Sequence, residues 1–563
     1  MKKPTIVLLC IAALLVGCAT PGANPTLRAT RTPVPPTATR TPIPPTSTPT
    51  PVPPTPTPTP LKVWIDPAVP ASLRDLASTA LAREMPAPAL SAAEADVRLG
   101  PGLPATVGRW VYAVVAPFPT YADDVRWEDV RSFWVGKPAA LAGLANDGQA
   151  PALFVTAETL AALQGLLGAP SPQAPISVTS SSELVDAAWA SRAHAWGIVP
   201  FDELQPRWKV LSVDGASVLD KALDVDQYPL TVDFGLGGQE AAALAGAFLR
   251  GGKLATNRDT ERMTVVIMTG VTAMARAIAA RMEEKGILYP TEKVAALLKS
   301  ADITHISNEI PFTEKCPTPD AHTKSLAFCS SPRYMEVLKA VGTDVIELTG
   351  NHVHDYGAQA LLDTLDLYRQ EGLLYFGGGK DLEEARKPLL LEKNGNKVAF
   401  IGCNPVGPPI AWATADGPGA APGDYDYMHA QLNQLKTQVD VPIATLQYWE
   451  FELYEPTPQQ RLDFRGLVDA GAKIVSGSQA HQPQALEFYK DGFIHYGLGN
   501  LFFDQMWSTP TRQEFIDRHV IYEGRHISTE LYTYLLEDYA QPRPMTAKER
   551  RTLLATVFKA SGW

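Results

Sequence analysis

Five apolar runs in the C-terminal half of this chain each lead directly into polar side chains. They lie at residues 264–268, 301–309, 342–357, 443–450 and 471–481. Short runs of this composition are typical of buried strands, and α/β sheets collect their functional side chains at the carboxyl ends of strands. The pattern therefore predicts an α/β domain over residues 264–504, with its functional groups gathered at one edge of the sheet.

The tripeptide Gly350-Asn351-His352 follows the third of these runs. An amide oxygen and an imidazole nitrogen are ligands for divalent metals, and glycine lets the backbone turn sharply after a strand. A single histidine in a turn is more often a hydrogen-bonded turn residue than a ligand. The indication of a metal-type site therefore comes from all five runs in this order.

Together these pieces resemble the CapA capsule-biosynthesis family, the poly-γ-glutamate capsule proteins of the calcineurin-like phosphoesterase superfamily. Asn351-His352 with Asp355-Tyr356-Gly357 is similar to the family's Asn-His, Asp and Gly pattern. Glu309 matches its Asn-Leu-Glu acid, and Tyr-Gly-Leu-Gly-Asn at 496–500 matches its Tyr-Ser-Leu-Gly-Asn turn. The resemblance implies an α/β/β/α sandwich and a role in making or exporting an anionic capsular polymer.

The chain departs from the family pattern at three positions. Val271 stands where the family has the aspartate of Gly-Asp, Gln447 where it has the histidine of His-Trp-Gly, and Gln479 where it has the first histidine of Gly-His-x-His. Valine cannot ligate a metal, and a glutamine amide is a poor ligand for zinc, manganese or iron. The resemblance thus implies no two-metal mechanism and either no metal or one divalent transition metal (Mn, Fe or Zn), held by Glu309, Asn351, His352 and His481.

The same motifs supply the candidate residues of a polar cleft. We expect catalytic roles, if any, for His352, His481 and Glu309, and contacts to substrate from Asn308, His354, Asp355, Gln447, Gln479, Asn500 and Arg276. His305 and Glu450 would converge on the same cleft. His305 or His354 could replace a missing ligand, although outward-facing loop histidines are the commoner case. Such a polar group is typical of a binding pocket or an altered catalytic pocket.

The N-terminus has the pattern of a lipoprotein signal peptide. Lys2-Lys3 precede an apolar run at residues 6–16, and Leu15-Val16-Gly17-Cys18 forms a lipobox. A transmembrane anchor would need roughly 20 apolar residues, and this run is shorter. We expect removal of residues 1–17, lipidation of Cys18, and export to the outer face of the cytoplasmic membrane or to the outer membrane.

Three further segments lie between the lipid and the CapA-like domain. Residues 18–60 are a Thr/Pro-rich linker that cannot bury a core. Residues 61–236 alternate short apolar runs with helical stretches and loosely resemble the phosphate-binding type of periplasmic-binding-like domain, as a solute-binding module or an interaction-forming one. Residues 237–263 are interpreted as a connecting helix and linker, and residues 505–563 as a C-terminal extension.

The cysteines indicate a disulfide, and the net charge bears on the possible partners. Cys316 and Cys329 lie in a loop-like stretch, and disulfides persist in exported proteins, so we expect a disulfide between them. Cys403 follows a strand-like run and is interpreted as a buried, inert thiol. The formal net charge of −11 argues against a nucleic-acid partner, because no basic stripe is visible.

Three functions remain open at this point. The first is a CapA-type envelope lipoprotein that acts with the machinery making or exporting poly-γ-glutamate or a related anionic polymer, through a degenerate metallophosphatase-like site. The second is an atypical metal-dependent phosphoesterase or other hydrolase. The third is a surface receptor whose N-terminal domain captures a small solute.

Overall fold

The computed structural model describes residues 60–563. The predicted signal peptide, the lipidation site at Cys18 and almost all of the Thr/Pro-rich linker lie outside the described residues. No helix between residues 60 and 563 is both long and apolar enough to cross a membrane.

The N-terminal domain is built on a mixed sheet in the order β2-β1-β3-β10-β4-β8-β6-β7. These strands are β1 Lys62–Ile65, β2 Ala87–Pro88, β3 Val97–Pro101, β4 Ala105–Pro117, β6 Ala152–Val155, β7 Ile176–Val178, β8 Ala195–Pro200 and β10 Thr231–Gly238; β5 Asp124–Val125, β9 Trp208–Val213 and β11 Ala255–Thr256 pair beside them. Its helices are α1 Ala71–Ala80, α2 Trp127–Trp134, α3 Ala157–Leu167, α4 Ser181–Ala190 and α5 Ala241–Ala245.

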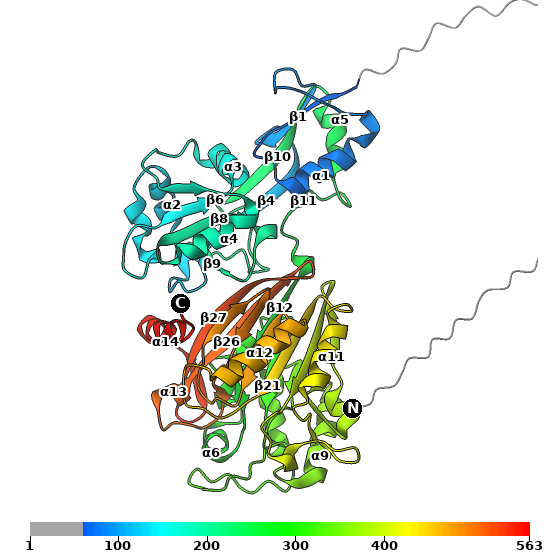
Figure 1. Cartoon of the computed structure of the whole chain (residues 1–563), viewed down its shortest axis with the longest axis vertical. Helices are drawn as coiled ribbons and strands as arrows, with labels where there is room; N and C mark the ends of the chain where they lie inside the picture. The colour runs from blue at the N-terminus through cyan, green and yellow to red at the C-terminus, as the bar shows by residue number, and fades with distance from the viewer. Residues whose placement is uncertain (1–59) are drawn as a thin grey trace, which may run out of the picture. The chain divides into compact units, whose positions relative to one another are not determined.

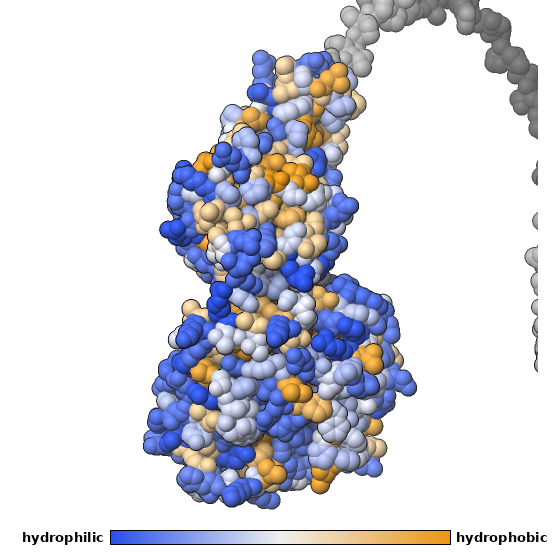
Figure 2. Space-filling model, turned by 60° about the vertical axis from the view of Figure 1, so that its left-hand side comes forward, coloured by the Kyte–Doolittle hydropathy of each residue, from blue (hydrophilic) through white to orange (hydrophobic). Residues whose placement is uncertain are grey.

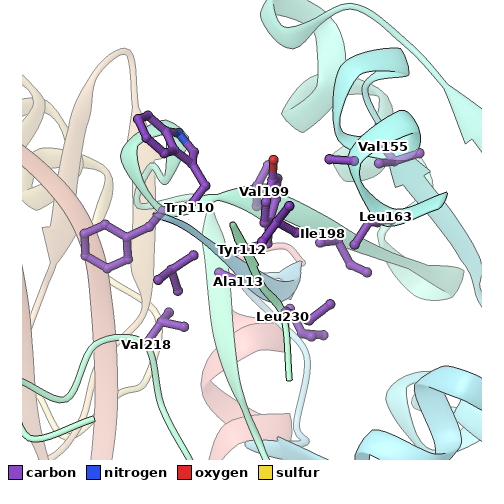
Figure 3. Close-up of a cluster of buried hydrophobic side chains, with 14 of the residues drawn as sticks. Trp110, Tyr112, Ala113, Val155, Leu163, Ile198, Val199, Val218 and Leu230 are labelled. Atoms are coloured by element: carbon purple, nitrogen blue, oxygen red, sulfur yellow. The ribbon is translucent and has the colours of Figure 1, made fainter. Parts of the chain in front are cut away.

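Strand β4 connects the two parts of this sheet, because it pairs with β10 along one part of its length and with β8 and β9 along another. Trp110 and Tyr112 of β4 pack in a core with Ile198 of β8 and Leu163 of α3 (Figure 3). The predicted α/β pattern is thus present. The connecting helix expected within residues 237–263 is short: α5 is followed by a 3-10 turn at Gly246–Phe248, and Phe248 is buried in the core.

The C-terminal domain contains two sheets. The first has the order β16-β15-β14-β12-β26-β27-β28, and the second the order β18-β19-β21-β22-β24-β23. The first comprises β12 Met263–Met268, β14 Ile303–Asn308, β15 Val345–Glu347, β16 Leu374–Phe376, β26 Gln513–Tyr522, β27 Arg525–Glu537 and β28 Gln541–Pro544, with the short β13 Val271–Thr272 and β25 Asn500–Phe502 alongside. The second comprises β18 Leu389–Lys393, β19 Asn396–Cys403, β21 Val441–Gln447, β22 Ile474–Ser478, β23 Leu486–Tyr489 and β24 Gly492–His495; β17 Gly378–Gly379 and β20 Gly419–Ala420 form a separate ribbon.

Helices cover the outer face of each sheet. Those packed on the first sheet are α6 Arg276–Lys285, α7 Ala295–Leu298, α8 Met335–Ala340 and α9 Gly357–Glu371. Those packed on the second are α10 Leu382–Arg386, α11 Tyr425–Leu435 and α12 Pro458–Ala470; α13 Thr509–Arg512 and α14 Ala547–Ala560 follow near the C-terminus. Figure 1 shows α11 and α12 lying over the strands of the second sheet.

Successive side chains of the buried strands point to opposite faces of their sheet. The apolar residues are therefore divided among three cores: one between the two sheets and one between each sheet and its helices. On β19, Val398 and Phe400 face the other sheet, whereas Ala399 and Ile401 face the helices. On β12, Val266 and Met268 likewise pack between the sheets and Ile267 packs against the helices. Strands buried on both faces need apolar residues at nearly every position, which explains the continuous apolar runs. The result is an α/β/β/α sandwich, and the predicted fold class is confirmed.

Residues 505–563 are an integral part of this sandwich. Strand β26 pairs antiparallel with β12, from Met263 opposite Tyr522 to Met268 opposite Asp517, and β27 and β28 extend the sheet beyond it. What the sequence indicated as an extension therefore completes the first sheet. Strand β26 is buried along its whole length, as expected for a strand in the interior of the sheet.

The helix ends follow ordinary capping chemistry. Thr457 caps α12 by accepting a hydrogen bond from the Gln460 N–H, with Pro458 at the first helical position. Thr546 and Glu549 form a capping box at the start of α14.

On the face turned to the viewer, Figure 2 shows hydrophobic residues mostly in small groups among hydrophilic ones.

Candidate functional site

The polar ends of four parallel strands meet at one edge of the sandwich. Glu309 follows β14 and Asn351-His352 follow β15, two neighbouring parallel strands of the first sheet. Gln447 ends β21 and Gln479 follows β22, two neighbouring parallel strands of the second sheet. The sandwich therefore brings these predicted site residues together from segments far apart in sequence.

Glu309 is almost completely buried, with 1% of its surface exposed. A Cβ atom at position 350 would lie 2.4 Å from the Glu309 Cα and Cβ atoms, so only glycine fits at Gly350. Burial raises the pKa of Glu309 to about 7, and the nearby His352 imidazole opposes that rise. The Gln447 amide lies close enough to Glu309 to lower this pKa, but neither carboxylate oxygen has a partner with hydrogen-bond geometry within residues 60–563.

His352 is held in place by Asp355. The imidazole Nδ1 lies 2.7 Å from Asp355 Oδ2, and the same carboxylate oxygen accepts a hydrogen bond from the Phe328 backbone N–H at 2.7 Å. Burial lowers the pKa of His352, but the hydrogen bond to Asp355 and the charges of Glu309 and Asp355 outweigh it, so that the pKa is raised overall. The Phe328 ring packs 4.5 Å from the imidazole, centroid to centroid.

Three amide side chains form a network beside Glu309. The Gln447 Nε2 group donates to Asn351 Oδ1 at 3.1 Å and also to Gln479 Oε1. Gln479 has φ +79° and His481 has φ +53°, a left-handed backbone conformation that costs energy for residues other than glycine. The surrounding structure thus holds this turn in a strained conformation at the site.

His481 is positioned by Asn500. Its Nδ1 lies 2.7 Å from Asn500 Oδ1, while Asn500 Nδ2 donates to the His481 carbonyl at 3.0 Å and to the Thr511 carbonyl at 3.0 Å. Burial lowers the pKa of His481 to about 4, so this imidazole is neutral near pH 7. Because its polar atoms are engaged in this way, Asn500 holds His481 in place, whereas a contact to substrate had been expected.

Arg276 lies between two aromatic rings. Its guanidinium carbon is 4.6 Å from the Phe328 ring centroid and 5.1 Å from that of Phe503, and the guanidinium forms an ion pair with Asp504. The His481 ring is stacked on Phe503 at 4.9 Å. Sequence reasoning missed Phe328, Phe503 and Asp504, because none of them belongs to a strand-end motif that implies chemistry.

Two predicted members of the cleft lie elsewhere. Asn308 points to the helical side of β14, where its Nδ2 donates to the Ile310 carbonyl at 2.7 Å and to the Tyr368 hydroxyl at 2.9 Å. His305 lies in the core between the sheets, with its Nε2 3.2 Å from Glu347 Oε2. Both expectations are corrected for one reason: alternate residues of a buried strand face opposite sides of the sheet.

His354 is half-buried, and its Nδ1 has no hydrogen-bond partner within residues 60–563. The loop that carries Phe328 is closed by a disulfide between Cys316 and Cys329, whose Cα atoms are 5.7 Å apart. Cys403 is a buried free thiol, and burial raises its pKa well above the ordinary range. The disulfide loop thus brings Phe328 against His352, next to the polar strand ends.

The described residues form no preformed metal centre. Within residues 60–563, no group of three or more His, Cys, Asp or Glu side chains is arranged to hold an ion. Of the four predicted ligands, Asn351 uses its amide oxygen for Gln447. His352 and His481 use Nδ1 for Asp355 and Asn500, which leaves the second ring nitrogen of each imidazole as its remaining donor atom.

Two sheets packed face to face between helices, with an Asn-His turn at the end of a parallel strand, define a calcineurin-like α/β/β/α domain. Residues 265–505 match the family model described as "Bacterial capsule synthesis protein PGA_cap". These residues thus match the CapA/PGA_cap family, and the resemblance noted in the sequence is confirmed.

Named relatives agree with this assignment. The chain is 27% identical over 317 residues to the capsule biosynthesis protein CapA of Bacillus anthracis, covering 54% of this chain and 76% of that protein. It is 27% identical over 282 residues to the PGA biosynthesis protein CapA of Bacillus subtilis, covering 49% and 74%.

Solved structures resemble parts of the chain at low similarity. The calcineurin-like phosphoesterase YfkN of Bacillus subtilis has a TM-score of 0.31 and 12% identity, covering 53% of this chain and 98% of that chain. An ABC-type phosphate transport receptor from Vibrio cholerae has a TM-score of 0.27 and 12% identity, covering 33% and 92%.

Proposed function

We propose that the protein acts in the synthesis or export of poly-γ-glutamate or a related anionic capsular polymer. The observation that carries the proposal is the match of residues 265–505 to the capsule synthesis family, which spans the whole candidate site from Val271 to Asn500. Two relatives from Bacillus that are named for capsule and PGA biosynthesis support the same assignment.

In this proposal the site acts without two-metal hydrolysis. Val271 offers no donor atom, and the amides of Gln447 and Gln479 hydrogen-bond each other at positions where the family has histidines. What is left at the strand ends is a buried acid, a His352–Asp355 pair and an amide network, a set of groups suited to binding a ligand by hydrogen bonds.

The proposed location is the cell envelope, with the lipid on Cys18 as the anchor and the Thr/Pro-rich segment as a spacer. The proposed partners are the membrane, the polymer and the machinery that makes it, with a small solute as a further partner of the N-terminal domain. The lipobox at residues 15–18 supports this placement.

Deletion of the gene followed by complementation tests the proposal. We expect loss of cell-associated capsular polymer on deletion and recovery with the wild-type gene. Complementation with His352→Ala should fail while the protein level is unchanged. Unaltered polymer in the deletion strain would contradict the proposal and leave the solute receptor as the better explanation. Metal-dependent turnover of phosphodiesters by the purified protein would favour the atypical hydrolase.

A further inference from the structure

The candidate site contains buried hydrogen-bond acceptors that lack donors. Both carboxylate oxygens of Glu309 and the Oε1 atom of Gln447 are buried without a hydrogen-bond partner in the described chain. Glu309 is 1% exposed and Gln447 is 0% exposed. A buried acceptor without a donor loses its hydrogen bonds to water with no replacement, and the cost is larger when the acceptor is charged. Such atoms at a strand-end site indicate that a ligand supplies the missing donors.

The cationic side chains nearby do not supply them. Arg276 is paired with Asp504, and His352 has its Nδ1 on Asp355. Glu450 and Asp355 add negative charge close to Glu309. The surroundings of Glu309 therefore have an excess of acceptors and of negative charge, which favours a positively charged, donor-rich group at this position.

A metal ion is the other positively charged partner, and it fits these residues poorly. A transition metal needs several ligands from imidazole, thiolate or carboxylate groups around one point, and no such group occurs within residues 60–563. A primary ammonium group makes smaller demands. It has three donors, as many as the unpaired acceptors, which are the two oxygens of Glu309 and the Oε1 atom of Gln447.

We propose that this site binds the primary ammonium group of a ligand, with Glu309 and Gln447 as its acceptors. The inference deepens the proposed function and rests on it only for the source of the ammonium. That source is either the free amino terminus of a γ-linked glutamyl chain or the amino group of a free amino acid.

Calorimetric titration of the purified full-length chain in detergent tests this inference. The probes are γ-linked triglutamate with a free amino terminus, the same peptide with an acetylated amino terminus, and free glutamate. We expect the free-amine probes to bind. Acetylation should weaken binding of triglutamate at least about tenfold, because it removes the positive charge and leaves only one of the three donors. Tighter binding of triglutamate than of glutamate would identify the chain end as the source of the ammonium group. Equal binding of the two would identify the free amino acid as the source.

Matched variants separate the pocket from the general charge of the region. Glu309→Gln removes the charge with little change of shape and should weaken binding of free-amine triglutamate at least about tenfold. Glu452→Gln removes one charge from a carboxylate that instead accepts from Trp507 Nε1 at 3.1 Å, and should change binding less than about twofold. Gln447→Met provides a second test in case Glu309→Gln does not fold, and it should also weaken binding.

Several results would overturn the inference: equal binding of the acetylated probe, unchanged binding by Glu309→Gln, no binding of any amine, or tight binding of Mn²⁺ or Zn²⁺ that depends on Glu309. The proposed function can be refuted independently of this inference. If deletion removes the polymer and the purified protein binds no amine, the inference is wrong and the function stands. If amine binding depends on Glu309 and deletion leaves the polymer intact, the ammonium site stands and the function fails.

Discussion

Gln447 donates from its side-chain nitrogen to the Asn351 side-chain oxygen over 3.1 Å, and this hydrogen bond joins the two sheets of the sandwich. Gln447 ends β21 of the second sheet, whereas Asn351 follows β15 of the first. The same nitrogen also donates to Gln479. Amide hydrogen bonds thus connect the strand ends at positions where the family pattern has metal ligands.

The first prediction concerns metal content. The purified protein should hold at most one equivalent of manganese, iron or zinc, because Val271, Gln447 and Gln479 remove three expected donors. Elemental analysis after dialysis measures this. Any single equivalent should disappear in His352→Ala, since a weak site cannot lose an imidazole. The triple variant Val271→Asp, Gln447→His, Gln479→His should hold more metal than the wild type. Two tightly held equivalents in the wild type would refute the prediction.

A second prediction concerns the membrane anchor. Cys18→Ser should release the protein into the soluble fraction, because the lipid is the only membrane-directed element expected after processing and no helix in residues 60–563 could span a bilayer. Fractionation and immunoblotting of cells that express each form provide the measurement. The matched control is Cys10→Ser, which leaves the lipobox intact and should stay in the membrane fraction. A processed Cys18→Ser protein that remained there would rule out the lipid as sole anchor.

The disulfide loop should contribute to stability. In protein exported to an oxidising compartment, non-reduced peptide mapping should find Cys316 linked to Cys329. Loss of the bond, by Cys316→Ser with Cys329→Ser, should cost up to about 3 kcal/mol of unfolding free energy, because the loop is short and its closure limits the unfolded chain. Denaturant melts measure the cost. A reductant should lower the stability of the wild type but not of the double variant, and two free thiols in exported protein would contradict the prediction.

Acid should destabilise the core that holds His519 and His526. Burial lowers the pKa of His526 to about 4 and that of His519 well below its ordinary value. The folded state therefore binds protons more weakly than the unfolded chain, whose histidines titrate near 6.5. The contribution is fully present above about pH 6.5 and is lost as the pH falls toward 4. A change of this size in pKa corresponds to about 3 kcal/mol for His526.

Urea unfolding at pH 8, 6 and 4.5 measures this dependence. His526→Gln should lose part of the acid sensitivity even if it is less stable at pH 8. The control is His322→Gln, whose imidazole is exposed and has no ion-pair partner within residues 60–563, so it should leave the pH profile unchanged. Equal acid sensitivity in His526→Gln and the wild type would show that the partly buried imidazole of His526 is not responsible.

The sequence by itself determined the fold class, the family and the position of the site along the chain. The reason is that strand runs, the Gly350-Asn351-His352 turn and the Cys316, Cys329 pair are local patterns, and the chemistry of each depends on neighbours in sequence. The loss of donors at Val271, Gln447 and Gln479 was visible for the same reason. The residue type at each of these positions is known from the sequence, and the type alone determines whether a side chain has a donor atom for a metal.

Only the tertiary structure decided which side chains meet. Asn308 faces a helix and His305 faces the opposite sheet, although both lie on β14, because the packing of two sheets and two helical layers sets which side of a strand is the site. The joining of β26 to β12 depends on a pairing between residues that are about 250 positions apart. The unpaired oxygens of Glu309 follow from the same packing, since a hydrogen bond is a distance between atoms that local sequence does not specify.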